Sequence, residues 1–133
     1  MKKEIEPGWE WHKPYAYSQA IRFGELLFVS GQAAIAADGS IAGGDDFQAQ
    51  ARQAFKNLAA VLEAAGGHLR DVLKVTIFVT DMKNFPAIVA LRHEFFTPPY
   101  PADSIVEVRA LALPGLLVEI EAVAGLRGEG NPR

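Results

Sequence analysis

A strongly β-forming segment between two helical patterns is the feature of this 133-residue chain that most restricts its fold. Residues 72–80 are rich in β-branched side chains, which predicts a buried strand. Two helices joined to such a strand lie on the same face of a sheet, because strand–helix–strand crossovers are right-handed. The pattern therefore predicts an α+β fold, with a mixed β-sheet that has two helices on one face and no cover on the other.

Each helix is predicted together with its ends. Apolar residues recur at helical spacing over residues 47–62, and we expect Asp45 to begin this helix in a capping box with Gln48. The Gly66-Gly67 pair ends it. The second helix is predicted over residues 85–96 and is ended by the proline-rich segment that follows.

The remaining strands come from both ends of the chain. Residues 19–23 and 26–30 are predicted to form a hairpin, and two more strands are predicted over 104–109 and 117–124. Prolines interrupt any regular pattern in residues 1–16, so we interpret this segment as an irregular N-terminal arm or an edge strand.

Composition excludes several classes of protein. The chain has no cysteine, which excludes disulfides, thiol nucleophiles and cysteine-bound metals, and its three histidines match no metal-binding spacing. We therefore expect no metal and no cofactor. A formal net charge of −3 gives no basic surface for nucleic acid or anionic membranes, and no apolar stretch has the length of a membrane span or a signal sequence. We expect a single cytoplasmic domain over residues 1–133.

Side-chain alternation predicts what the uncovered face carries. In the last strand, even-numbered residues are assigned to the helices and Glu119 and Glu121 to the uncovered face. The same parity in the preceding strand puts Asp103 on the uncovered face too. That face is also predicted to carry the apolar stripe of the central strand, and a face this apolar predicts a symmetric homo-oligomer. The stripe consists of Leu73, Val75, Ile77 and Val79.

Two groups of residues are candidates for chemistry. The hydroxyl, backbone amides and side-chain amide of Ser30-Gly31-Gln32 can bind a small polar ligand at a strand end; the alternative is that Ser30 only satisfies that end. Glu119 and Glu121 share a strand face, where repulsion and burial would raise one pKa toward a general acid or base role. The alternative is an ordinary solvated strand face.

The sequence resembles the RidA/YjgF family, also named the endoribonuclease L-PSP family, over residues 17–124. The resemblance implies a chorismate-mutase-like fold, a homotrimer, and small-molecule clefts between adjacent subunits. It is carried by the order and spacing of several motifs: Tyr17-Ser18-Gln19-Ala20, Leu27-Phe28-Val29-Ser30-Gly31-Gln32, Gln50-Ala51-Arg52-Gln53-Ala54, Val75-Thr76-Ile77-Phe78-Val79-Thr80-Asp81-Met82, Phe95-Phe96, Pro101-Ala102, Val106-Glu107-Val108 and Val118-Glu119-Ile120-Glu121-Ala122.

The resemblance also implies an activity, the hydrolysis of reactive enamines and imines to a keto acid and ammonia. It implies that Glu119 positions or activates water, and that Tyr17, Ser30 and Gly31 shape the site, with Gln32 beside them as a substrate-binding candidate. In the family an arginine in a Pro-Ala-Arg-Ser pattern binds the substrate carboxylate, whereas this chain has Asp103 at that place.

An aspartate at position 103 changes the expected substrate. Two carboxylates in a partly desolvated cleft repel each other strongly, even at an effective dielectric of about 20. We therefore predict a substrate other than 2-aminoacrylate, with Asp103 pairing to an amine or dividing the acid and base roles with Glu119. Arg22 or an arginine of a neighbouring subunit is a further candidate for the missing cation.

Two other functions are compatible with the same residues. The first is a non-catalytic trimeric protein that binds small ligands in the clefts. The second, ribonuclease activity, follows only from the older family name and is the weakest, because the chain has no basic groove. Trp9 and Trp11 in the arm predict a pocket wall unlike the usual one.

Overall fold

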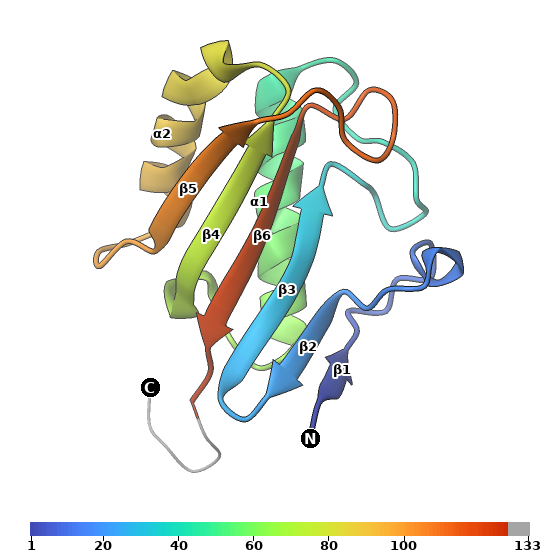
Figure 1. Ribbon diagram of the computed structural model, residues 1–133, viewed down its shortest axis with the longest axis vertical. Coiled ribbons are helices and arrows are strands. Elements are labelled where there is room, and N and C mark those ends of the chain that lie inside the picture. The colour runs from blue at the N-terminus through green and yellow to red at the C-terminus, as the bar shows by residue number, and fades with distance from the viewer. Residues whose placement is uncertain (128–133) are drawn as a thin grey trace.

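The computed structural model describes residues 1–127 and forms a six-stranded sheet backed by two helices (Figure 1). Its strand order is β1-β2-β3-β6-β4-β5, in which β4 and β5 run parallel and the other neighbours run antiparallel. The predicted α+β architecture is thereby confirmed. The elements are β1 (Lys3–Ile5), η1 (Lys13–Tyr15), β2 (Ala20–Phe23), β3 (Leu26–Ala33), α1 (Phe47–Ala64), η2 (Leu69–Asp71), β4 (Val72–Val79), η3 (Met82–Asn84), α2 (Phe85–Phe95), β5 (Ala102–Glu107) and β6 (Val118–Gly125).

The first helix begins one residue later than predicted. Asp46, not Asp45, is the N-cap, and its carboxylate accepts a hydrogen bond from the backbone N–H of Ala49 at 3.3 Å. The predicted end is confirmed: Gly66 follows the helix with φ of +82°, a conformation that glycine adopts without steric cost.

The hydrophobic core lies between the helices and the sheet, and the central strand faces it. Val75, Ile77 and Val79 of β4 are fully buried. The prediction that this stripe lies on the uncovered face was therefore wrong for these three residues, whereas Leu73, next to a register shift in β4, is 53% exposed. An apolar stripe removes more surface from water beneath two helices than on an open sheet, so burial favours the observed orientation.

The predicted parity is correct for β6 and wrong for β5. In β6 the even-numbered residues, such as Ile120, are buried, and Glu119 and Glu121 point to the uncovered face. In β5 it is Ile105 that packs against the core, because it is paired in register with Ile77 of β4. Asp103 belongs to the same side of β5, so it does not share a face with Glu119.

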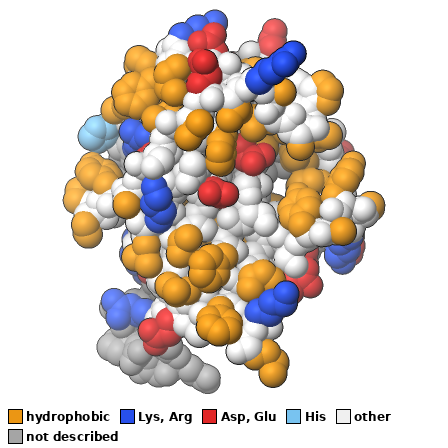
Figure 2. Space-filling view, in the orientation of Figure 1, with side chains coloured by type: hydrophobic (Ala, Val, Ile, Leu, Met, Phe, Trp, Pro, Cys, Tyr) orange, Lys and Arg blue, Asp and Glu red, His pale blue; other side chains and the backbone are white. Residues whose placement is uncertain are grey.

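The uncovered face combines apolar and acidic groups. Large hydrophobic side chains on or beside it are 41–56% exposed, and Figure 2 shows carboxylates near its middle with hydrophobic groups gathered around them. Such a patch is unusual for a face that stays in water. The exposed hydrophobic residues are Phe23, Leu26, Phe28, Leu73 and Val106.

The N-terminal segment contains both structures that were predicted as alternatives. β1 pairs with β2 at the edge of the sheet, and the residues after it form an irregular arm. His12 is completely buried in this arm, with its Nε2 2.8 Å from Glu6 Oε2. Within residues 1–127, no helix is long and apolar enough to cross a membrane.

Candidate functional site

A hollow of about 240 Å³ lies beside Glu119, where β3 ends and β6 begins. We call it the Glu119 hollow. Its walls are aromatic on the side of the N-terminal arm and aliphatic on the side of the segment before β6. Among the described residues that line it, none carries a positive charge. The lining comprises Trp11, Tyr15, Tyr17, Gly31, Ala33, Ile35, Ala112, Leu113, Leu116 and Glu119.

The absence of a side chain at Gly31 leaves the space that the Glu119 carboxylate occupies. The register between β3 and β6 shifts between Val29 and Gln32, and this irregularity brings the backbone of Gly31 against Glu119. A Cβ at position 31 would lie 2.6 Å from Glu119 Cδ and would also overlap Oε2. Only glycine therefore leaves room for the carboxylate where it stands.

The electrostatics of the hollow favour protonated groups. Burial raises the pKa of Glu119, and the negative charge of Glu121 raises it further. Burial also raises the pKa of Tyr17, with an added contribution from Glu119. Glu119 therefore holds a proton to higher pH than an ordinary glutamate does. The neighbouring Tyr17 likewise keeps its hydroxyl proton to higher pH than an ordinary tyrosine does.

The structure brings Tyr17, Gly31 and Glu119 together, as the resemblance implied, but places Ser30 and Gln32 behind them. The Ser30 hydroxyl donates a 2.6 Å hydrogen bond to the carbonyl of Ser18. Gln32 is 2% exposed, and its amide donates to the side-chain oxygen of Gln19 at 2.7 Å. Both side chains hold the segment that carries Tyr17, and their direct contact with a ligand stays a prediction.

Two buried polar residues of α1 support the walls, a role that was not predicted from the sequence. The Gln50 side-chain amide donates to the carbonyl oxygens of Gly44 and Gly115 at 2.7 and 2.8 Å, and its oxygen accepts from Leu117 N–H at 2.9 Å. The Asn57 side-chain amide donates to the carbonyl oxygens of Ala33 and Ile35, two lining residues at and just after the end of β3, at 2.9 and 2.8 Å. Both are polar residues on the apolar face of a helix, and that placement was the sequence signal from which a supporting role could have been predicted.

Trp11 forms part of the pocket wall that was predicted from the N-terminal arm. Its ring packs edge-on against Tyr17, with centroids 6.4 Å apart, and both rings line the hollow. Trp9 instead packs against the core. The arm does form a wall of the Glu119 hollow, but it does so with Trp11 and Tyr15 and not with Trp9.

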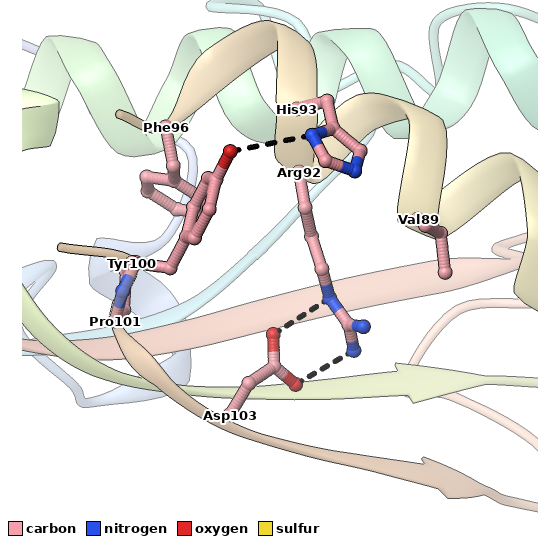
Figure 3. A pocket seen from close by; sticks show the side chains of 7 residues that line it. All are labelled: Val89, Arg92, His93, Phe96, Tyr100, Pro101 and Asp103. Atoms are coloured by element: carbon pink, nitrogen blue, oxygen red, sulfur yellow. Dashed lines mark hydrogen bonds and ion pairs between the residues drawn. The ribbon is translucent and has the colours of Figure 1, made fainter. Parts of the chain in front are cut away.

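Asp103 lies in a different place from the one predicted. It is on the helix side of β5, where Arg92 of α2 contacts both of its oxygens: Nε is 2.8 Å from Oδ2 and Nη2 is 2.9 Å from Oδ1 (Figure 3). Burial raises the pKa of Asp103, and Arg92 opposes part of that rise. Within one chain, Asp103 and Glu119 line separate hollows, so they do not divide acid and base roles there.

Comparison with known proteins identifies the relatives of this chain. Residues 12–126 match the profile of a family described as "Endoribonuclease L-PSP". The chain belongs to the RidA/YjgF family. A RidA/YjgF relative of Escherichia coli, the RutC family protein YjgH, is 47% identical over 118 residues, which are 85% of this chain and 87% of the relative.

Other RidA/YjgF proteins extend the comparison. A protein of Salmonella typhimurium named 2-iminobutanoate/2-iminopropanoate deaminase is 38% identical over 112 residues, 81% of this chain and 85% of the deaminase. The crystal structure of the Rid-family protein YyfA from Yersinia pestis matches with a TM-score of 0.85 and 39% identity, over 95% of this chain and all of the other. The mixed sheet with two helices is thus the fold of solved RidA/YjgF structures.

Proposed function

We propose that this chain hydrolyses a small imine or enamine in the Glu119 hollow and releases ammonia. The observation that carries the proposal is the Glu119 carboxylate, which is seated on Gly31, has a raised pKa and faces an aromatic wall. The presence of a named deaminase among relatives of this chain supports the reaction class.

The hydrolysis needs one group that can accept and return a proton. Glu119 takes a proton from water as the water oxygen attacks the carbon of a protonated imine, and the C=N electron pair moves to nitrogen. The same proton then passes to the nitrogen of the carbinolamine. The C–N bond breaks, ammonia leaves, and loss of the hydroxyl proton forms the carbonyl; ammonia takes up that proton and becomes ammonium. An enamine enters the same route after protonation at its β-carbon.

The lining favours a substrate that differs from 2-aminoacrylate. A carboxylated substrate finds no cation among the described residues of this hollow and faces the charge of Glu119. A cationic iminium is attracted both by Glu119 and by the faces of the aromatic rings. The aromatic and aliphatic walls fit an apolar substituent larger than that of 2-aminoacrylate.

The proposal includes a homotrimer. The uncovered sheet face exposes large hydrophobic side chains next to Glu119 and Glu121, and such a face is covered most simply by copies of itself. In the homotrimer the Glu119 hollow would open into a cleft between subunits, as the family resemblance implies.

A matched pair of substrates tests the reaction. A flavin-dependent amine oxidase acting on phenethylamine produces an uncarboxylated imine, and a flavin-dependent amino-acid oxidase acting on phenylalanine produces its carboxylated counterpart. We expect the protein to accelerate ammonia release from the first imine more than from the second. Glu119→Gln should lower the rate by roughly 10² to 10⁴-fold, whereas Glu121→Gln, on the same strand face, should keep most of it.

One result would favour the alternative of a non-catalytic binding protein. Trimeric protein whose melting temperature rises with small apolar amines, but which accelerates no imine in the panel, would be a ligand-binding member without the proposed activity. Cleavage of RNA by the purified protein would favour the ribonuclease alternative.

A further inference from the structure

The N-terminal arm folds around one buried histidine. His12 is 0% exposed and contacts residues whose rings line the Glu119 hollow, although it does not line the hollow itself. We propose that Glu6 and His12 form a positioning pair that fixes the aromatic wall of this hollow and so makes it selective for substrates with an aromatic substituent. The proposal rests on the proposed imine hydrolysis for the identity of the substrate, whereas the placement of the rings is independent of any activity.

The carboxylate of Glu6 holds both the histidine and the turn before it. Its Oε2 lies 2.8 Å from Nε2 of His12, and its Oε1 accepts hydrogen bonds from the backbone N–H groups of Gly8 and Trp9, each at 3.1 Å. The other ring nitrogen of His12, Nδ1, has no hydrogen-bond partner among residues 1–127. Burial of a polar ring is costly unless it is partnered, so Glu6 is the group that compensates the burial of His12.

The His12 ring contacts two rings of the wall at once. Its centroid lies 5.6 Å from that of Trp11 and 5.5 Å from that of Tyr17. The Trp11 and Tyr17 centroids are themselves 6.4 Å apart. Edge-on and tilted contacts at these separations are favourable for aromatic rings. Because His12 is the completely buried member of this cluster, a shift of its ring would displace both rings that line the hollow.

The backbone of the arm indicates that its contacts impose its shape. The carbonyl oxygen of His12 accepts a hydrogen bond from the backbone N–H of Tyr15 at 2.9 Å, and Ala16 follows with φ of +62°. A residue with a Cβ adopts this left-handed conformation only at a cost, and the conformation persists where surrounding contacts hold it. Ala16 joins Tyr15 to Tyr17, and both of these side chains line the hollow. The strained residue therefore helps to orient two rings of the wall.

A fixed aromatic wall favours an aromatic ligand. Trp11 also packs against the apolar cluster that contains Ala33, Ile35 and Leu116 of the lining. A wall that is already ordered loses little conformational freedom when a ligand binds, so its ring surface contributes more to affinity. Contacts with a substituent remote from the reacting carbon are made equally in the ground and transition states. The wall should therefore affect substrate binding more than the chemical step.

Titrations of the full-length protein with two stable amines, followed by NMR or calorimetry, test the selectivity. Phenethylamine carries the aromatic substituent and ethylamine lacks it, so we expect the wild-type protein to bind phenethylamine roughly tenfold more tightly. Glu6→Met removes the partner of His12, and His12→Phe keeps a ring but loses the contact with Glu6. Each should weaken phenethylamine binding roughly fivefold and leave ethylamine binding within about twofold.

Glu10→Met is the matched control, because it makes the same exchange in the same arm. Glu10 is exposed and pairs with the exposed Lys13 at 2.6 Å, so its removal should leave both affinities unchanged. Melting curves verify that all three variants are folded.

The fluorescence of Trp11 reports on the wall without any ligand. The chain has two tryptophans, so Trp9→Phe leaves Trp11 as the only one. In this background Glu6→Met and His12→Phe should each shift the emission to longer wavelength, because a loosened Trp11 becomes more hydrated. Glu10→Met should not shift it.

The outcomes separate this inference from the proposed reaction. Preference for phenethylamine without hydrolysis of any imine would contradict the reaction alone. Where hydrolysis occurs, KM for the phenethylamine-derived imine should rise in Glu6→Met and His12→Phe, with kcat within about threefold of the wild type. Equal binding of the two amines by the wild-type protein would overturn the inference. So would a phenethylamine preference or a Trp11 emission that stays unchanged in either variant.

Discussion

At the scale of single residues, the candidate site depends on the absence of one side chain. Gly31 leaves space that the Glu119 carboxylate occupies, and the backbone at this glycine is not in the left-handed region, so another residue could adopt it. Glycine is therefore required at position 31 to leave space for the carboxylate, and not to adopt an unusual backbone conformation. A motif of serine, glycine and glutamine next to a strand end indicates a site, but it does not reveal this contact with Glu119.

Gly31→Ala should abolish most of the activity and leave the fold intact. The new Cβ would overlap the end of a flexible glutamate side chain, which can rotate away at small cost. We expect the free energy of unfolding to change by no more than about 1 kcal/mol and the rate of imine hydrolysis to fall by roughly 10²-fold. Urea unfolding and ammonia release measure the two quantities. Unchanged activity would show that the position of Glu119 over Gly31 is not the productive one.

The raised pKa of Glu119 should couple activity to stability through pH. The folded chain keeps a proton on Glu119 at pH values where the unfolded chain has lost it, so ionisation costs stability as pH rises from the ordinary glutamate range through the raised pKa. Glu119→Gln removes this cost. Its melting temperature should exceed that of the wild type at about pH 8 and approach it at about pH 4. An equal difference at both pH values would contradict the raised pKa.

Glu121→Gln is the companion test, because Glu121 adds to the pKa rise at Glu119. Its removal should lower the pKa of Glu119 and move the acidic limb of the kcat/KM profile to lower pH. The shift should vanish in the Glu119→Gln background. A profile that does not move would assign the acidic limb to another group.

At the scale of elements, α1 both covers the core and fixes the walls of the Glu119 hollow. Gln50 is completely buried and makes three hydrogen bonds to the loops before α1 and before β6. Gln50→Leu would leave two carbonyls and one N–H without partners, and we expect it to lower the free energy of unfolding by about 2–4 kcal/mol. Gln48→Leu makes the same exchange at an exposed position of the same helix and should change it by less than about 0.5 kcal/mol. Equal effects of the two would show that Gln50 is not a support of the loops.

Much of the element order could be predicted from the sequence, because propensity and capping are local. Residues 72–80 and the two helices fall within one or two residues of their observed positions. The face on which Asp103 lies could not be predicted this way. Its orientation depends on the register of β5 against β4, where Asp103 is opposite Val75, and register is set by contacts between distant segments. The ion pair with Arg92 follows from that register, and so it also escaped sequence-based reasoning.

At the scale of the whole molecule, the uncovered sheet face is the part that a single chain leaves unexplained. Phe28 is 46% exposed there and borders a shallow hollow that also contains Lys74 and Glu121. Removing exposed apolar surface from water is favourable, so association of subunits through this face would stabilise the protein. In the proposed homotrimer this face would be covered, and the Glu119 hollow would lie at a subunit boundary.

Phe28→Arg tests this assembly. An arginine repeated by symmetry at an apolar contact would bring like charges together and leave them desolvated, so the variant should dissociate into subunits. Light scattering should give three times the 14.4 kDa chain mass for the wild-type protein and a single chain mass for Phe28→Arg. Ala90→Arg, on the exposed side of α2, should remain trimeric. If the hollow is completed by a neighbouring subunit, activity must fall with dissociation in Phe28→Arg and persist in Ala90→Arg; a monomeric wild type that still hydrolyses imines would confine the site to one chain.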